Sequence, residues 1–376
     1  MFPWLKCAAY LLIFCIIIEL IILGPPLTNR ITTSIYQYNL DLKVGDVLTN
    51  EGKLQHTGYL SFPTLHWNPQ SLNSTLYKSL RYKQWDFYAM YTENITLCVA
   101  LADIGYAKNA FITIYEKGRD PITYDQIIFP WEPTKMSDTS EEGTTFYNSS
   151  SIFVLFVNAH KYLKSVIAHN SNTEINLQFR KSPQQESIVY LGPFNSDMSQ
   201  FFYSHKVYNY KVYGYAEIQG REYVFDNELG MLDWVRGVWP YHGGWIWGSG
   251  MGEYQGNKFA LNLGELPKDP NVAKATDDCV IINEMMIKLD VVVMEKSEKD
   301  ENVWEFKTVN SEPQAMYSVI KGEFRVEAKY NKKINFWVFQ SYLIQNFGVF
   351  EGEVKTLEEN YKFKVRGILE VHSARW

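Results

Sequence analysis

The segment from Asp233 to Gly250, D-W-V-R-G-V-W-P-Y-H-G-G-W-I-W-G-S-G, constrains most strongly what this chain can fold into. It holds four of the chain's 11 tryptophans and interleaves them with glycines. Flat rings beside residues that have no side chain favour a dense apolar wall with close approaches of the backbone. The segment therefore predicts either the lining of a cavity or the seam between two sheets.

The composition and the patterning predict an all-β protein. Tyr and Phe number 26 and 22, and aromatic residues favour strands. Apolar and polar residues alternate with period two in residues 175–180, 208–218, 323–330 and 361–366, which is typical of half-buried strands. Turns are expected at 117–120, 219–220 and 330–333, and short helices at 158–169 and near Asn346. Many strands with few helices indicate a sandwich or a barrel.

The N-terminus predicts a membrane segment. Residues 7–24 are almost entirely apolar and are followed by Pro25 and Pro26, which suits one transmembrane helix kept as a signal-anchor. A cleaved signal peptide and a tail anchor are the alternatives. Lys6 on the short side favours a lumenal or extracellular body, in the endomembrane system or at the cell surface. Candidate glycosylation sites on that body are Asn73, Asn94 and Asn148, although such triplets also arise by chance.

The domain organisation follows from these segments. We expect an anchor at 1–27, a linker at 28–55, a first β-barrel-like domain at 56–190 and a second at 191–376. The net charge of −6 argues against nucleic acid as a partner. Cys98 and Cys279 either pair in an oxidising compartment or stay as two buried thiols. The spacing of His and Cys supports no metal site, and no cofactor is expected.

Three residues of the opening segment are candidates for catalysis: Asp233, Arg236 and His242. Asp233 among tryptophans would lose hydration, so its pKa would rise unless a cation compensates. In one interpretation it protonates an alkene of a bound isoprenoid. In the other it forms a buried pair with Arg236, which requires a bulge or turn at Gly237 because a regular strand puts the two on opposite faces. His242 is either a general base or a hydrogen-bonded structural residue.

The remaining candidates would contact a ligand. Trp245 and Trp247 lie two residues apart and so share one face of a strand, whereas Trp234 and Trp239 fall on opposite faces of a regular strand. Each of these rings lines a cavity or belongs to the core. The ligand-binding candidates are Trp234, Trp239, Tyr241, Trp245, Trp247 and Asn262.

Several ordered motifs resemble a known family. They are D-W-x-R-G-V-W-P-Y from Asp233, W-x-W-G-S-G from Trp245, 85–88, 101–106, 261–264, 288–290 and the final Arg375-Trp376. Across residues 56–376 they resemble the family catalogued as domain of unknown function 2804. This chain has Asp277-Asp278 where that family usually has an acid followed by an amide. The resemblance implies two lipocalin-like (calycin) antiparallel barrels or sheets, distantly related to carotenoid hydratases and tocopherol-cyclase-like proteins, and it implies no activity.

The sequence favours a membrane-anchored protein that binds a hydrophobic small molecule, a lipid or an isoprenoid. Such ligands need apolar cavities with a few placed polar groups. One alternative is a cofactor-independent hydratase, isomerase or cyclase that acts on a polyene or isoprenoid, with Asp233 as the acid. Another is a structural or interaction protein whose barrels are filled by its own side chains. An open cavity that contains Asp233 without Arg236 would favour the enzyme.

Overall fold

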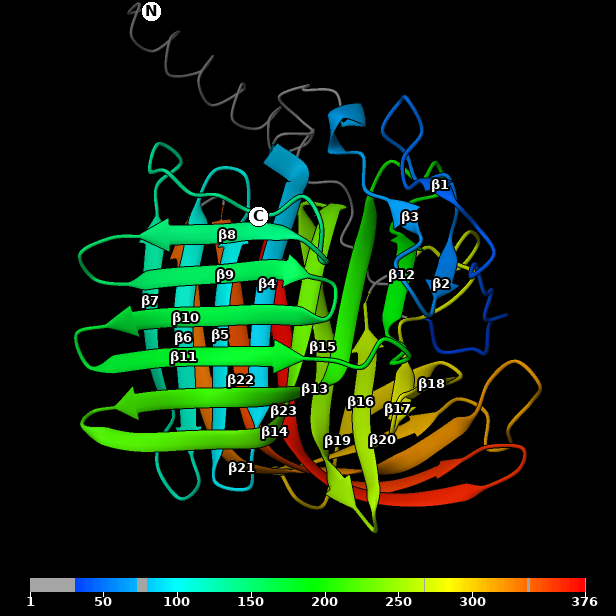
Figure 1. Cartoon of the computed structure of the whole chain (residues 1–376). Helices are drawn as coiled ribbons and strands as arrows, with labels where there is room; N and C mark the ends of the chain where they lie inside the picture. Colours follow the sequence, from blue (N-terminus) through cyan, green and yellow to red (C-terminus); the bar gives the residue numbers. More distant parts are fainter. Residues whose placement is uncertain (1–30, 73–79, 267, 337–338, 376) are drawn as a thin grey trace, which may run out of the picture.

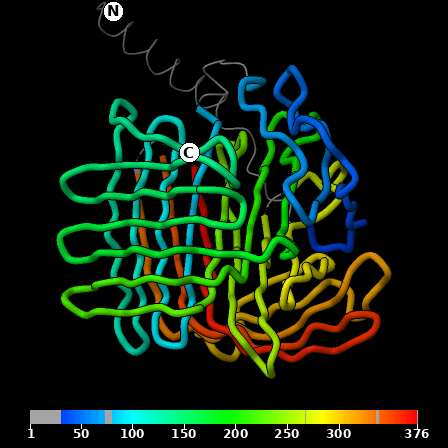
Figure 2. Tube along the Cα trace, viewed as in Figure 1, coloured from blue at the N-terminus to red at the C-terminus, as the bar shows by residue number. Residues whose placement is uncertain are grey.

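The computed structural model describes residues 31–72, 80–266, 268–336 and 339–375, and in them the chain folds into two large curled sheets (Figures 1 and 2). Two short strands, β1 (Gly45–Asp46) and β3 (Leu65–His66), form a separate parallel pair, followed by the 3-10 turn η1 (Pro69–Ser71). Every strand pair of the two large sheets is antiparallel in the described residues. The all-β prediction is confirmed.

The first sheet has 12 strands among the described residues. Its main path runs in the order β7 (Ile122–Ile128), β6 (Lys108–Glu116), β5 (Ile95–Asp103), β4 (Tyr82–Tyr91), β14 (Arg221–Val238), β13 (Phe201–Ile218), β11 (Thr173–Arg180), β10 (Leu163–Asn170), β9 (Phe153–His160) and β8 (Gly143–Asn148). Strand β12 (Ile188–Pro193) pairs with β13 and with β2 (Gly58–Leu60).

The second sheet has nine strands in the same described part of the chain. Their order is β18 (Met285–Lys288), β17 (Cys279–Ile282), β16 (Asn257–Glu265), β15 (His242–Tyr254), β23 (Asn360–Arg375), β22 (Phe339–Lys355), β21 (Val319–Phe336), β20 (Val303–Thr308) and β19 (Val292–Lys296). In the described residues, the first and last strands of each sheet do not pair with each other, so each sheet is a curled half-barrel and not a closed barrel.

The chain passes from the first sheet to the second at residues 239–241. The domain boundary predicted at 190 stays a prediction.

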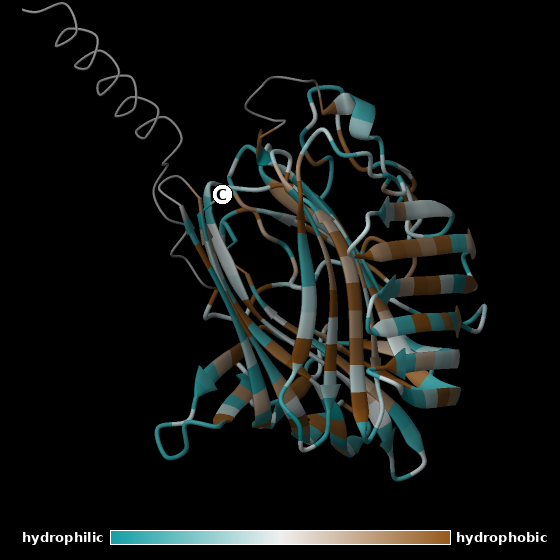
Figure 3. Cartoon of the chain, turned by 90° about the vertical axis from the view of Figure 1, so that its left-hand side faces the viewer, coloured by the Kyte–Doolittle hydropathy of each residue, from teal (hydrophilic) through white to brown (hydrophobic). Residues whose placement is uncertain are grey.

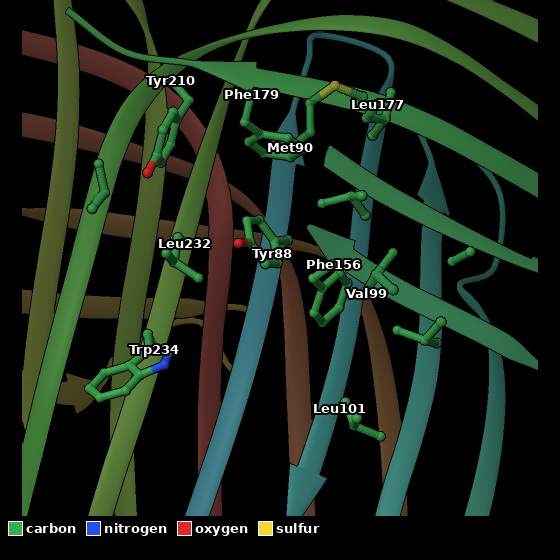
Figure 4. Close-up of a cluster of buried hydrophobic side chains, with 14 of the residues drawn as sticks. Tyr88, Met90, Val99, Leu101, Phe156, Leu177, Phe179, Tyr210, Leu232 and Trp234 are labelled. Atoms are coloured by element: carbon green, nitrogen blue, oxygen red, sulfur yellow. The ribbon is translucent and has the colours of Figure 1, made fainter. Parts of the chain in front are cut away.

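The first sheet folds over itself, so that β8–β11 cross in front of β4–β7, and β21–β23 lie behind both (Figures 1 and 3). One apolar core fills the fold of the first sheet, and Figure 4 shows part of it, with Tyr88 against Phe156 and Phe179. A second core lies between the two sheets. A third fills the curl of the second sheet.

Two bulges let one strand serve two of these cores. In β13 the register shifts between Val207 and Tyr210, where Asn209 has φ +55°. Tyr208 therefore packs between the sheets while Tyr210 packs inside the first sheet, which corrects the prediction that they share a face. An extra residue in a strand reverses the facing of all that follow. In β21 the shift between Val326 and Ala328 has the same effect.

Strand β15 shows why tryptophan and glycine alternate in the opening segment. Trp247 and Met251 face the core between the sheets, while Gly248 and Gly250 lie over the buried ring of Phe350 on the other side. A Cβ atom at Gly250 would lie 2.9 Å from that ring. Glycine is thus required for close packing on one face, and the indoles occupy the other.

Three further secondary-structure predictions need correction, and the structure decides between the two alternatives for Cys98 and Cys279. Residues 158–169 form the end of β9, a turn at 161–162 and most of β10, the stretch near Asn346 is strand, and residues 330–333 continue β21 instead of turning. The turns at 117–120 and 219–220 are confirmed, and the latter uses left-handed residues at Gln219 and Gly220. Cys98 and Cys279 are free and buried.

The localisation predicted from the sequence is also corrected. Over the ranges that the structure describes, no helix has both the length and the apolar character that crossing a bilayer requires, which contradicts a single-pass membrane protein with a lumenal or extracellular body. The predicted anchor at residues 7–24 lies outside the described residues.

We expect the substitution Gly250→Ala to lower the free energy of unfolding by about 1–3 kcal/mol, because the added methyl overpacks a core against Phe350. The control is Glu253→Ala, at an exposed position of the same strand, which should change it by less than about 0.5 kcal/mol. Urea unfolding measures both. Equal stability of the two variants would show that the glycine face of β15 tolerates side chains.

Candidate functional site

A cavity of about 480 Å³ lies between the two sheets. The first sheet contributes one wall from β4–β7, β13 and β14, and the second sheet contributes the other from β15 and β21–β23. Its lining is mostly aromatic and aliphatic, and the side chains that carry polar groups are Lys108, Asn109, Lys206, Asp233, Lys332, Ser341, Glu370 and His372, apart from the Tyr and Trp ring groups. The size and the lining are typical of a site for a small apolar ligand.

Three of the predicted tryptophans meet at this cavity. Trp239, Trp245 and Trp247 all line it, together with Trp85 of β4, which the sequence motifs contained without suggesting a site role. The ring of Trp85 lies 5.5 Å from that of Trp239 and 5.9 Å from that of Trp245, centroid to centroid. The opening segment therefore forms both the cavity lining and the seam between the sheets.

The other ligand candidates lie away from the lining. Trp234 is buried inside the first sheet (Figure 4), whereas Trp239 belongs to the core between the sheets. Tyr241 lies under the guanidinium of Arg81. Asn262 does not line the cavity but holds a ring that does, because its side-chain oxygen accepts the indole N–H of Trp247 at 2.8 Å.

Asp233 of β14 lines the cavity and is 5% exposed. Its Oδ2 accepts the indole N–H of Trp85 at 3.1 Å, whereas its Oδ1 has no hydrogen-bond partner among the described residues. Lys206 lies directly opposite on β13. Burial raises the pKa of Asp233, and the Lys206 cation opposes that rise.

Arg236 does not contact Asp233, because β14 is regular here and the two residues point to opposite faces. The guanidinium pairs with Asp86 at 2.9 Å in a fully buried contact and lies 4.1 Å from the centroid of the Trp234 ring. The predicted pair of Asp233 and Arg236 is therefore wrong. Arg236 belongs to the core of the first sheet.

His242 begins β15 opposite Arg375 and is not among the residues that line the cavity. Its ring contacts Tyr241 edge-on, and burial lowers its pKa. Of the predicted glycosylation sites, Asn94 and Asn148 are exposed, and Asn73 lies outside the described residues. Glycosylation remains a prediction.

Two polar side chains of β23 that line the cavity escaped the sequence analysis. Glu370 and His372 both line the cavity. The Glu370 carboxyl accepts the side-chain N–H groups of Gln345 at 2.8 Å and Trp245 at 3.3 Å, and burial raises its pKa to about 7. Burial lowers the pKa of His372 to about 3. The one available signal was an acid inside the apolar run Gly367 to Val371.

Two buried side chains, Asn262 and Asp277, hold Lys206 in place. Its ammonium donates to Asn262 Oδ1 at 3.0 Å and to Asp277 Oδ2 at 3.1 Å. Lys206 and Lys268 hold the pKa of Asp277 well below its usual range in spite of burial. The first aspartate of the Asp277-Asp278 pair thus fixes a cation at the cavity, and Asp278 accepts the backbone N–H of Gly264 at 2.7 Å.

We expect Trp245→Phe to weaken the binding of the apolar dye anilinonaphthalene sulfonate about three- to tenfold, because a smaller ring leaves less apolar surface to cover. The matched control is Trp234→Phe, whose ring lies outside the cavity. That variant should lose about 1–2 kcal/mol of stability and keep the affinity. Fluorescence titration and urea unfolding separate the two effects, and equal affinities for both variants would argue against a wall role for Trp245.

Glu370 should make stability depend on pH. In the unfolded chain a Glu titrates near about 4.3, and in the folded chain it titrates at about 7. The folded state holds the proton more tightly between these values, so this group lowers the free energy of unfolding as pH rises through them. Relative to the native protein, Glu370→Gln should therefore gain on the order of 3 kcal/mol between about pH 4 and about pH 8. Denaturant unfolding at several pH values measures the gain, and a constant difference would contradict it.

Comparison with known proteins gives the following matches. Solved structures similar to this chain include a putative AttH from Nitrosomonas europaea, 10% identical, with 82% of this chain and 97% of that chain covered and a TM-score of 0.47. CghA is 11% identical, with 78% and 88% covered and a TM-score of 0.48. Kievitone hydratase from Nectria haematococca is 10% identical, with 78% and 88% covered and a TM-score of 0.44.

Sequence comparison gives the family. No curated protein matches the chain. The model of a domain of unknown function, number 2804, matches residues 40–376, which is the stretch that forms both sheets and the cavity between them. The chain therefore belongs to the family of the domain of unknown function 2804.

Proposed function

We propose that this protein is a cofactor-independent hydratase, isomerase or cyclase that acts on a polyene or isoprenoid. The observation that carries the proposal is Asp233 Oδ1, a buried carboxyl oxygen at an apolar cavity with no hydrogen-bond partner among the described residues. A buried oxygen without a partner costs about 1–3 kcal/mol. A catalytic role is one reason why a native structure keeps a buried group without a partner.

The walls suit chemistry that passes through a carbocation. The faces of aromatic rings attract a cation within about 6 Å of their centres, and four indoles line this cavity. An apolar lining also keeps out bulk water, which strengthens the electrostatic effect of the few charged groups. Aromatic ring faces and an apolar lining both suit a protein that transfers protons to and from an alkene, and such a transfer uses no cofactor.

A hydrophobic-ligand binding protein is the second candidate, because the same lining suits binding without reaction. The position of Asp233 favours the enzyme over this reading, since it faces the cavity while Arg236 pairs elsewhere. A protein with filled barrels is at odds with the open volume between the sheets. Membrane anchoring forms no part of the proposal.

The test is isotope incorporation from labelled water. Incubated in D₂O with a panel of isoprenoid polyenes, the native protein should transfer deuterium to carbon of one substrate, detected by mass spectrometry. Asp233→Asn should lower the rate about 10²–10⁴-fold and keep the substrate affinity. The control Asp226→Asn, at an exposed position of the same strand, should keep the rate. Tight binding of a polyene without any deuterium uptake would favour the binding protein.

A further inference from the structure

Two tryptophan–carboxyl pairs face the cavity from opposite sheets. In the first sheet, Trp85 on β4 donates its indole N–H to Asp233 on β14 at 3.1 Å. In the second sheet, Trp245 on β15 donates its indole N–H to Glu370 on β23 at 3.3 Å. The rings of Trp85 and Trp245 stack with their centroids 5.9 Å apart, so the two pairs meet at one place in the seam.

The strand register gives the two carboxyls different electrostatic surroundings. Asp233 is the direct cross-strand partner of Lys206. Lys206 is only 3% exposed, and hydrogen bonds to Asn262 and Asp277 hold its ammonium in place. Side chains directly opposite each other in an antiparallel pair have Cβ atoms about 4.5–5.5 Å apart. The cross-strand partners of Glu370 are Trp247 and Gln345, both neutral.

From this juxtaposition we infer that Glu370 donates the proton to the substrate and that Asp233 accepts one. The inference rests on the proposed function and reverses the role that the sequence suggested for Asp233. A cation beside one buried carboxyl stabilises its ionised form, and neutral neighbours leave the other protonated. Two carboxyls whose surroundings differ in this way divide into a base and an acid.

The pKa directions agree with the geometry. Burial raises the pKa of Glu370 to about 7, whereas Lys206 and the Trp85 N–H oppose the rise at Asp233. The other titratable groups whose charge interacts with one or both carboxyls are Tyr91, Cys98, Tyr208, Asp86 and Asp277, and Lys108, Lys332 and His372 also line the cavity. Among them His372 is neutral near pH 7, because burial lowers its pKa to about 3.

In a hydration, the O–H bond of Glu370 breaks and the proton forms a C–H bond at one alkene carbon. The neighbouring carbon becomes a cation beside the indole faces. A water molecule forms a C–O bond to it, and Asp233 Oδ1 takes the proton that this water releases. One C=C π bond and one water are consumed, and the proton returns from Asp233 to Glu370 through solvent. In an isomerisation, Asp233 instead removes a proton from a carbon next to the cation.

The substrate class follows from the same geometry. The carboxyls and Lys206 lie where the two sheets meet, and most of the remaining lining is apolar, including Phe111, Ile127, Ile334 and Leu343. The other charged or polar side chains of the lining, apart from Tyr and Trp, are Lys108, Asn109, Lys332, Ser341 and His372. We therefore expect an apolar molecule whose reacting alkene lies beside Trp85 and Trp245 and whose hydrocarbon body extends along these residues.

Infrared difference spectroscopy at about pH 6 tests the assignment on the protein without substrate. The carbonyl band of a protonated carboxyl should vanish in Glu370→Gln and persist in Asp233→Asn, with Asp226→Asn as the control that changes no such band. In the conservative variant Glu370→Asp the band should shift and remain. Loss of the band in Asp233→Asn, or its persistence in both variants, would overturn the inference.

The pH dependence of deuterium uptake gives the second readout. The native rate should fall as pH rises past about 7, and Glu370→Gln should lower it about 10²–10⁴-fold. A rate in Glu370→Gln equal to that of Asp226→Asn would also overturn the inference. Absence of deuterium uptake by the native protein would instead count against the proposed function, and the infrared bands would still report which carboxyl carries the proton.

Discussion

The packing of the two sheets against each other through indole rings is the interaction on which the rest of the structure depends. Rings from β4 and β15 meet in the seam, and their bulk holds the sheets apart along one stretch, beside which the cavity lies. Strand β15 can present these rings only because its other face is glycine packed on Phe350. A Cβ atom at Gly250 would press on the Phe350 ring, so the glycines let β15 pack closely on Phe350 while its tryptophans face the cavity.

Bulges explain how a few long strands connect three cores. Strands β13 and β21 each change facing once, at Asn209 and between Val326 and Ala328. Before the bulge in β13, Phe202 and Lys206 line the cavity; after it, the strand serves the interior of the first sheet. The bulge in β13 therefore sets which residues of this strand reach the site.

Burial gives the polar groups of the site their chemical character. Removing a carboxyl from water favours its neutral form, and a nearby cation reverses that preference. Lys206 is held by Asn262 and Asp277, so it acts on Asp233 from a fixed position, whereas Glu370 has only neutral cross-strand neighbours. The site is thus asymmetric in charge even though each carboxyl accepts an indole N–H in the same way.

The sequence alone determined that the body is built of strands, that Trp245 and Trp247 share a face, and that the segment 233–250 forms a wall, because alternation with period two follows directly from strand geometry. Only the tertiary structure decided that Arg236 pairs with Asp86, that Tyr208 and Tyr210 face different cores, and that Glu370 lines the same cavity as Asp233. Strand order and bulges depend on contacts between residues far apart in the chain, and no local pattern contains them. The acid in β23 and the cavity wall of β4 come together only when the two sheets pack.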